Sequence, residues 1–263
     1  MSPLKALLDG LIDYAGLFPP AALEMPVAVQ QYAAYRSGSD AWALGRFIGP
    51  LARLGELREE AAAFADSGAW KLSVLVLPGE PVPPEIESVE LKIERAGDIR
   101  RASAHLPRLR YFEIPNDADP RDLLAELAAT GGRAKVRTGG LKPESYPPVV
   151  ELARFLCTCA AAGVPFKATA GLHHPIACPP IHGFINLFLA ALLAYHGGAP
   201  PDVEATLEET SAGAFTWDAD GVSWHGYRLS TAQIAVARAQ FAVAFGSCSF
   251  EEPIGGLQAL EWL

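Results

Sequence analysis

The sequence contains few cysteines, and their spacing is not that of a disulfide scaffold. Four cysteines are spread over 263 residues. Cys157 and Cys159 are two residues apart in a helical pattern, so their side chains point in different directions, whereas Cys178 and Cys248 are isolated. A chain of this length buries roughly three-quarters of its unfolded surface and needs no covalent links. We therefore expect a reducing, cytoplasmic compartment.

Blocks of basic residues and long apolar runs are also absent. The formal net charge is −9, and no Lys or Arg block alternates with aromatic residues, which argues against nucleic acid and anionic membranes as partners. The first residues lack a signal-peptide pattern, because Asp9 and Asp13 interrupt their apolar stretch. The longest apolar run, residues 183–195, is too short to span a bilayer and predicts a buried helix.

What the chain does contain is a regular alternation of β-rich runs and helical patterns. This alternation predicts a parallel sheet with helical crossovers. Eight strands are expected, the number that a (β/α)8 barrel requires, at residues 11–17, 44–48, 71–77, 89–93, 111–114, 134–138, 166–169 and 243–249. We therefore predict an α/β fold, a single TIM-type barrel domain over residues 1–263.

The segments between these strands mostly have helical character. Helices are expected at residues 26–36, 51–65, 98–105, 121–129, 149–162, 183–195 and 230–241, with Glu251 and Glu252 at the start of a final helix. Residues 78–88 are too short and too rich in proline for a crossover helix, so a plain loop or a misplaced strand is expected there. Residues 214–227 predict a β-hairpin inserted between the seventh and eighth strands.

Charged residues occur inside strands that a barrel should bury on both faces. They are Arg46, Glu90, Lys92, Glu113, Lys135, Arg137 and Lys167. Alternate residues of a strand share a face, so these side chains converge inside the barrel if their apolar neighbours contact the helices. Five cations then meet two carboxylates, or three if Asp13 joins them. Because an unpaired buried charge is costly, the surplus predicts an anionic ligand, a neutral lysine, or both, and salt bridges at the strand ends are the alternative.

Three of the last strands run directly into glycine, in the segments KVRTGG, KATAGLHHP and FGSCSFEEP. Barrel enzymes form their active sites at the carboxyl ends of the strands and bind phosphate after strands seven and eight. Glycine lets backbone N–H groups approach such an anion closely. We therefore expect an anion or substrate site that includes Arg46, Arg137, Gly139, Thr169, Gly171, His174, Gly246 and Ser247.

The lysine on the sixth strand is followed by Thr-Gly, and the lysine on the seventh by a small residue and Gly. This arrangement resembles deoxyribose-phosphate aldolase and related class I aldolases. The resemblance implies that Lys135 forms a Schiff base, that Lys167 lowers its pKa, and that Glu90 or Glu113 relays protons. It covers two short motifs, and Arg137 replaces a small polar residue of that family. KATAGLHHP and FGSCSFEEP also resemble motifs of a bacterial family from which no activity carries over.

Together these features predict a class I aldolase-like lyase without a cofactor or a metal. Its substrate would be a small anionic carbonyl metabolite, phosphorylated or carboxylated, and a homo-oligomer is compatible with the sequence. A second lysine about 5 Å from the first would lower the pKa of Lys135 by about two units, and partial burial by about one more. His173 is expected to contact the substrate or to move protons.

Two alternative functions remain. His173, His174, Cys178 and His182 lie within ten residues, and such side chains bind zinc or iron, as in a metal-dependent lyase, isomerase or hydrolase. However, adjacent histidines rarely reach one ion, and no pair lies at i, i+4 on an evident helix. The other alternative is a barrel that binds a sugar phosphate without turnover. Cys248 acting as a nucleophile with one of the histidines also stays open.

Overall fold

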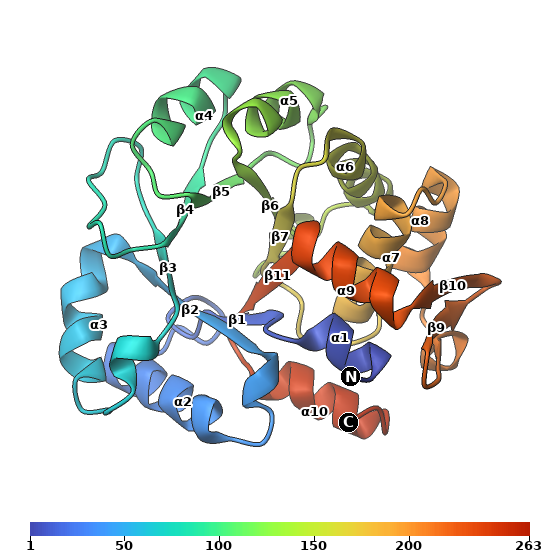
Figure 1. Ribbon diagram of the computed structural model, residues 1–263, viewed down its shortest axis with the longest axis horizontal. Helices are drawn as coiled ribbons and strands as arrows, with labels where there is room; N and C mark the ends of the chain where they lie inside the picture. Colours follow the sequence, from blue (N-terminus) through green and yellow to red (C-terminus); the bar gives the residue numbers. More distant parts are fainter.

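Eight parallel strands close into a barrel in the computed structural model, which describes all 263 residues (Figure 1). The strands are β1 (Ile12–Tyr14), β2 (Leu44–Pro50), β3 (Leu72–Leu75), β4 (Ser88–Lys92), β5 (Leu109–Glu113), β6 (Arg133–Arg137), β7 (Phe166–Thr169) and β11 (Ala242–Ser247). Each strand pairs with the next along the chain, and β11 closes the barrel between β7 and β1. The predicted (β/α)8 barrel is confirmed.

Helices surround the strands as a ring (Figure 1). They are α1 (Pro3–Leu8), α2 (Met25–Ser37), α3 (Leu54–Ala61), α4 (Ala96–Ser103), α5 (Arg121–Thr130), α6 (Val149–Ala162), α7 (Phe184–Tyr195), α8 (Pro200–Glu208), α9 (Thr231–Gln240) and α10 (Glu251–Ala259). The helix α6 has its predicted bounds, whereas α1 and α8 were not predicted and α3 is shorter than expected. No helix joins β3 to β4, as the prolines of that segment indicated.

Helix ends follow the residues that favour them. Gly131 ends α5 and Gly163 ends α6, each with a positive φ, of 65° and 64°, that residues with a Cβ rarely adopt. Ser230 begins α9 with a capping box, in which its hydroxyl accepts from the Gln233 backbone N–H and the Gln233 side chain accepts from the Ser230 N–H. These local signals explain why the crossover helices could be located from the sequence.

The apolar run at residues 183–195 forms the buried helix that was expected. Every residue of α7 except Tyr195 is buried, because α6, α8, α9 and β11 all pack around it. Its one buried polar side chain, Asn186, accepts from the Ala177 N–H and donates to the carbonyls of Thr206 and Glu209. No helix in the chain combines the length and apolar character needed to cross a membrane.

The insertion before β11 forms a three-stranded antiparallel sheet of β8 (Thr216–Trp217), β9 (Gly221–Trp224) and β10 (Tyr227–Ser230). The predicted hairpin is therefore present as β8 and β9. The third strand was not predicted, and it follows a tight turn at His225 and Gly226, which have φ values of 40° and 85°. This sheet lies beside α9, outside the barrel (Figure 1).

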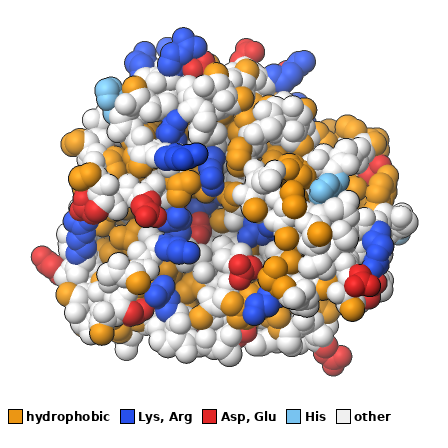
Figure 2. Space-filling model, viewed as in Figure 1, with side chains coloured by type: hydrophobic (Ala, Val, Ile, Leu, Met, Phe, Trp, Pro, Cys, Tyr) orange, Lys and Arg blue, Asp and Glu red, His pale blue; other side chains and the backbone are white.

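Most of the apolar core lies between the strands and the helices. Phe166 of β7, for example, packs against Phe155 of α6 and Phe188 of α7. Because side chains alternate along a strand, its neighbour Lys167 then points into the barrel. Figure 2, in the view of Figure 1, shows further Lys and Arg side chains on the surface near the centre of this face. The outward apolar packing thus directs charged side chains toward the barrel axis.

Candidate functional site

The two lysines occupy matching positions on neighbouring parallel strands. In the pairing of β6 with β7, Lys135 lies opposite Lys167, while the apolar pairs Ala134–Phe166 and Val136–Ala168 flank them. Lys135 is 5% exposed and Lys167 is 1% exposed. The predicted adjacency of the strands and the inward direction of both lysines are confirmed.

The lysines belong to a chain of alternating charges across the barrel interior. The Lys167 Nζ lies 2.5 Å from Asp13 Oδ2 and 2.7 Å from Glu90 Oε1. The Lys135 Nζ lies 2.9 Å from Glu90 Oε2 and 3.1 Å from Glu113 Oε2. Glu90 is therefore the shared partner of both ammonium groups, and the Ser73 hydroxyl donates a further hydrogen bond to it over 2.9 Å.

This arrangement keeps both lysines charged. Burial lowers the pKa of Lys135, but Glu90 and Glu113 outweigh burial and raise that pKa above its ordinary value. Burial likewise lowers the pKa of Lys167, and Asp13 and Glu90 reverse that effect. The repulsion that we expected from Lys167 does act on Lys135, but the carboxylates between them dominate. The prediction that Lys167 brings Lys135 to a near-neutral pKa is thus wrong, because the pKa of Lys135 is raised.

The charge chain opens into a cavity of about 440 Å³. Its lining comes from the carboxyl ends of the barrel strands and the loops after them, and includes Glu90, Glu113, Lys135, Arg137, Tyr146, Thr169, Gly171, His173, Gly246 and Cys248. Of these, Tyr146 gave no signal in the sequence, whereas most of the others were predicted. Lys167 and Asp13 do not line the cavity, and Lys167 is linked to its lining by the contact with Glu90.

Glycines bring two loops together beside this cavity. A Cβ on Gly139 would lie 2.7 Å from the Cα of Gly171, so neither position accepts a side chain without movement. Gly171 also has a φ of 78°. The Thr138 hydroxyl donates to the Ala170 carbonyl over 2.6 Å and fastens the loops to each other. Gly139 therefore shapes the site, although it was predicted to bind an anion and does not line the cavity.

Arg137 lies at the rim, in register with Thr169 of β7, which in turn pairs with Gly246 of β11. Its side chain is exposed and forms neither a salt bridge nor a hydrogen bond within the chain. A guanidinium without a partner, beside glycine-rich loops, is suited to binding a carboxylate or phosphate. Arg137 therefore supports the predicted anion site.

We expect millimolar phosphate to stabilise the protein by about 1 kcal/mol relative to chloride of equal ionic strength, a rise in Tm of about 2–4 °C. Thermal unfolding measures this shift. Arg137→Ala should abolish the difference, whereas Arg58→Ala, an arginine in a different cavity, should retain it. A shift that survives in Arg137→Ala would place the anion elsewhere.

Several predicted binding residues lie away from this cavity. Arg46 points inward but near the start of β2, where its Nη1 donates to the Leu72 carbonyl over 3.1 Å. His174 is exposed, and Ser247 is buried, with its hydroxyl accepting from the Ser249 N–H. The predicted surplus of cations is also wrong. The buried network holds Lys135 and Lys167 against three carboxylates, because Lys92 and Arg137 are exposed and Arg46 lies lower.

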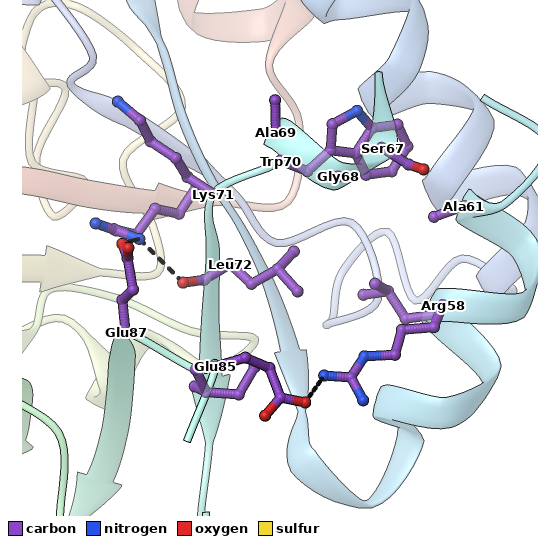
Figure 3. Close-up of a pocket in the computed structure, with 13 residues that line it drawn as sticks. Arg58, Ala61, Ser67, Gly68, Ala69, Trp70, Lys71, Leu72, Glu85 and Glu87 are labelled. Carbon is purple, nitrogen blue, oxygen red and sulfur yellow. Dashed lines mark hydrogen bonds and ion pairs between the residues drawn. The ribbon is translucent and has the colours of Figure 1, made fainter. Parts of the chain in front are cut away.

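Arg46 instead lines a separate cavity of about 580 Å³ beside α3 and β3 (Figure 3). Although this cavity is larger than the first, both of its arginines contact carboxylates, and Lys71 is its one charged side chain without a partner. Arg58 contacts Glu85 at 2.5 Å (Figure 3). Arg46 Nη1 lies 3.9 Å from Glu87 Oε2. The buried lysines and the glycine-rich loops belong to the other cavity, so we assign the candidate active site there.

No family model and no curated protein matches this chain. Among solved structures, the chain is similar to a tetrameric deoxyribose phosphate aldolase from Aeropyrum pernix, with 13% identity and a TM-score of 0.39. The match covers 98% of this chain and 97% of the aldolase. A similarity this distant does not bear on activity, so a functional assignment depends on the cavity itself.

The structure separates the histidines that could have formed a metal site. His182 is buried and its Nε2 contacts the Pro147 carbonyl at 2.8 Å, and burial lowers its pKa. His173 lines the cavity of about 440 Å³, with Nδ1 2.5 Å from Glu252 Oε2. No group of three or more His, Cys, Asp or Glu side chains is arranged to hold a metal ion. Of the three clustered histidines, His173 is therefore the only one placed to act in the cavity.

Proposed function

We propose that this protein is a lyase of the class I aldolase type, in which Lys135 forms a Schiff base with a small anionic carbonyl compound. The main support is that Lys135 is the one lysine that lines the cavity, with the Glu113 carboxylate 3.1 Å from its Nζ. A lysine amine beside a carboxylate that can exchange its proton is the arrangement that imine chemistry requires.

Lys135 must lose a proton before it can attack a carbonyl carbon. Its raised pKa means that the ammonium form prevails at rest. Glu113 is the better acceptor, because its side chain is 17% exposed and contacts only Lys135, whereas Glu90 is 1% exposed and is held by two ammonium groups. In this proposal Lys167 keeps Glu90 ionised and in place, so it positions the network rather than lowering the pKa of Lys135.

The remaining groups have roles that follow from their positions. Arg137, which lacks a carboxylate partner, would hold the anionic end of the substrate at the rim. His173 lines the same cavity, and its contacts with Cys248 and Glu252 raise its pKa despite partial burial. It would therefore be protonated at a higher pH than an ordinary histidine, and would donate the proton that the carbon atom needs after C–C cleavage.

Borohydride reduction with a panel of aldehydes, ketones and 2-oxo acids should trap an adduct on Lys135, identified by peptide mass spectrometry. Lys135→Ala should lose it and lower turnover by roughly a thousandfold or more, because the covalent step is lost. Lys142→Ala, an exposed lysine next to the cavity loop, should retain the adduct.

An adduct that persists in Lys135→Ala would refute the proposal, as would no adduct with any compound of the panel. Circular dichroism must show that the variant is folded. Selective phosphate binding without any adduct would instead indicate the non-catalytic barrel, which binds a sugar phosphate without turnover.

A further inference from the structure

A second set of reactive side chains lies at the rim of the same cavity. Cys248, directly after β11, has its Sγ 3.9 Å from Nε2 of His173, which follows β7. The other ring nitrogen, Nδ1, lies 2.5 Å from Oε2 of Glu252, in the first turn of α10. The three residues come from two different barrel loops, and the fold alone brings them together.

The order of these contacts matches a nucleophile, a base and a group that orients the base. If Nδ1–H donates to Glu252, then Nε2 is left to accept the thiol proton of Cys248. The distance from Sγ to Nε2 is at the long end of a sulfur hydrogen bond, as is common before a substrate binds. The His173 ring thus links the thiol of Cys248 to the carboxylate of Glu252.

The surroundings distinguish Cys248 from the other thiols of the chain. Cys248 and His173 both line the cavity, and Cys248 is only 9% exposed, so its thiol meets a bound ligand rather than bulk solvent. Cys159 is buried within α6, and Cys178 is exposed. Cys248 is the cysteine whose sulfur contacts a histidine.

We infer that Cys248 is a second nucleophile of this protein, and that it accepts the acyl group of a small anionic ester or thioester. The sulfur forms a bond to the carbonyl carbon while the bond from that carbon to the leaving group breaks. The thiol proton passes to His173 and then to the leaving group. Water, deprotonated by His173, next hydrolyses the enzyme thioester and releases the free acid and the thiol.

The choice of an anionic substrate comes from Arg137, which lines the cavity with Cys248 and has no partner in the chain. Glu252 does not line the cavity, so it is a positioning residue that acts through His173. This inference does not depend on the Schiff base, because the nucleophile is a different residue.

The mono-p-nitrophenyl ester of succinic acid is a suitable probe. Rapid mixing should give a burst of nitrophenolate, and peptide mass spectrometry should find the succinyl group on Cys248 and not on the exposed Cys178. Cys248→Ala should lose the burst, and Lys142→Ala, at an exposed lysine outside the cavity lining, should retain it. A succinyl group on Cys248 and not on Lys135 separates this activity from the lyase reaction. Acylation of Cys178 at an equal rate, or a burst in Cys248→Ala, would overturn the inference.

Variants of His173 and Glu252 test whether these residues activate Cys248. His173→Gln should slow acylation at least about tenfold, and Glu252→Gln several-fold, whereas the neighbouring Glu251→Gln should not change it. Glu252→Asp should restore part of the rate, which a merely structural role would not explain. An unchanged rate in a folded His173→Gln protein would overturn the role of the imidazole. If that variant does not fold, the comparison of Cys248 with Cys178 in the unaltered protein still decides.

Discussion

Replacement of Glu90 with glutamine is expected to lower the free energy of unfolding by about 3–5 kcal/mol, because the change leaves buried charges without their partner. Glu90 holds Lys135 through one oxygen, at 2.9 Å, and Lys167 through the other, at 2.7 Å. A neutral amide would leave two nearby ammonium groups with one carboxylate each. Urea denaturation followed by circular dichroism measures the difference.

The matched control is Glu56→Gln, which removes an exposed pair with Arg53 and should leave the free energy of unfolding nearly unchanged, because solvent screens that pair. A second signature is the dependence on acid. Burial by itself raises the pKa of Glu90, but Lys135 and Lys167 hold it well below its ordinary value. Its contribution is therefore complete above the ordinary glutamate pKa and declines as the pH falls below it, a loss that Glu90→Gln should lack. A cost near that of the control would mean that the network is solvated.

Adduct formation on Lys135 is expected to accelerate about 100-fold between pH 7 and pH 9, because the neutral amine increases about tenfold per pH unit below the pKa. The attacking species is the free amine, and Glu90 and Glu113 raise the pKa of Lys135 above its ordinary value. The charge network stays ionised over this range, because the pKa of Lys167 is also raised. Borohydride trapping at a fixed short time gives the rate at each pH.

A rate that levels off near pH 7 would contradict this expectation. Such a plateau would mean that the pKa of Lys135 falls when substrate binds, because Glu90 and Glu113 no longer raise it. Comparison with Glu113→Gln identifies the carboxylate responsible, since that variant loses one of the two groups that raise the pKa. Its plateau should appear at a lower pH than that of the unaltered protein.

The fold was largely predictable because each barrel strand has an apolar outer face and turn residues at its ends. The eight strand positions were right for this reason, and so were the bounds of α6. The errors fall where such signals are weak. α8 is a short helix of nine residues, and β10 lies at the edge of a small sheet, so neither needs a continuous apolar face. α3 ends early because the chain then forms tight turns.

The candidate site was predictable only in part. Alternation along a strand correctly placed Lys135, Lys167 and Glu113 inside the barrel, since side-chain direction has a period of two. The same pattern cannot say how deep along the barrel a side chain lies. Arg46 was therefore assigned to the substrate site although it lies near the start of its strand.

The sequence by itself determined the barrel, the inward face of the strands that carry charged residues, and the lysine pair on β6 and β7. Only the tertiary structure decided which charges meet. Lys167 contacts Glu90, which is 77 residues away in the chain, and Asp13, which is 154 residues away. Coulomb energy depends on the distance between charges in space and not on their separation in sequence. The direction of the pKa shift of Lys135, and the meeting of Cys248 with His173, therefore became visible only once the barrel had closed.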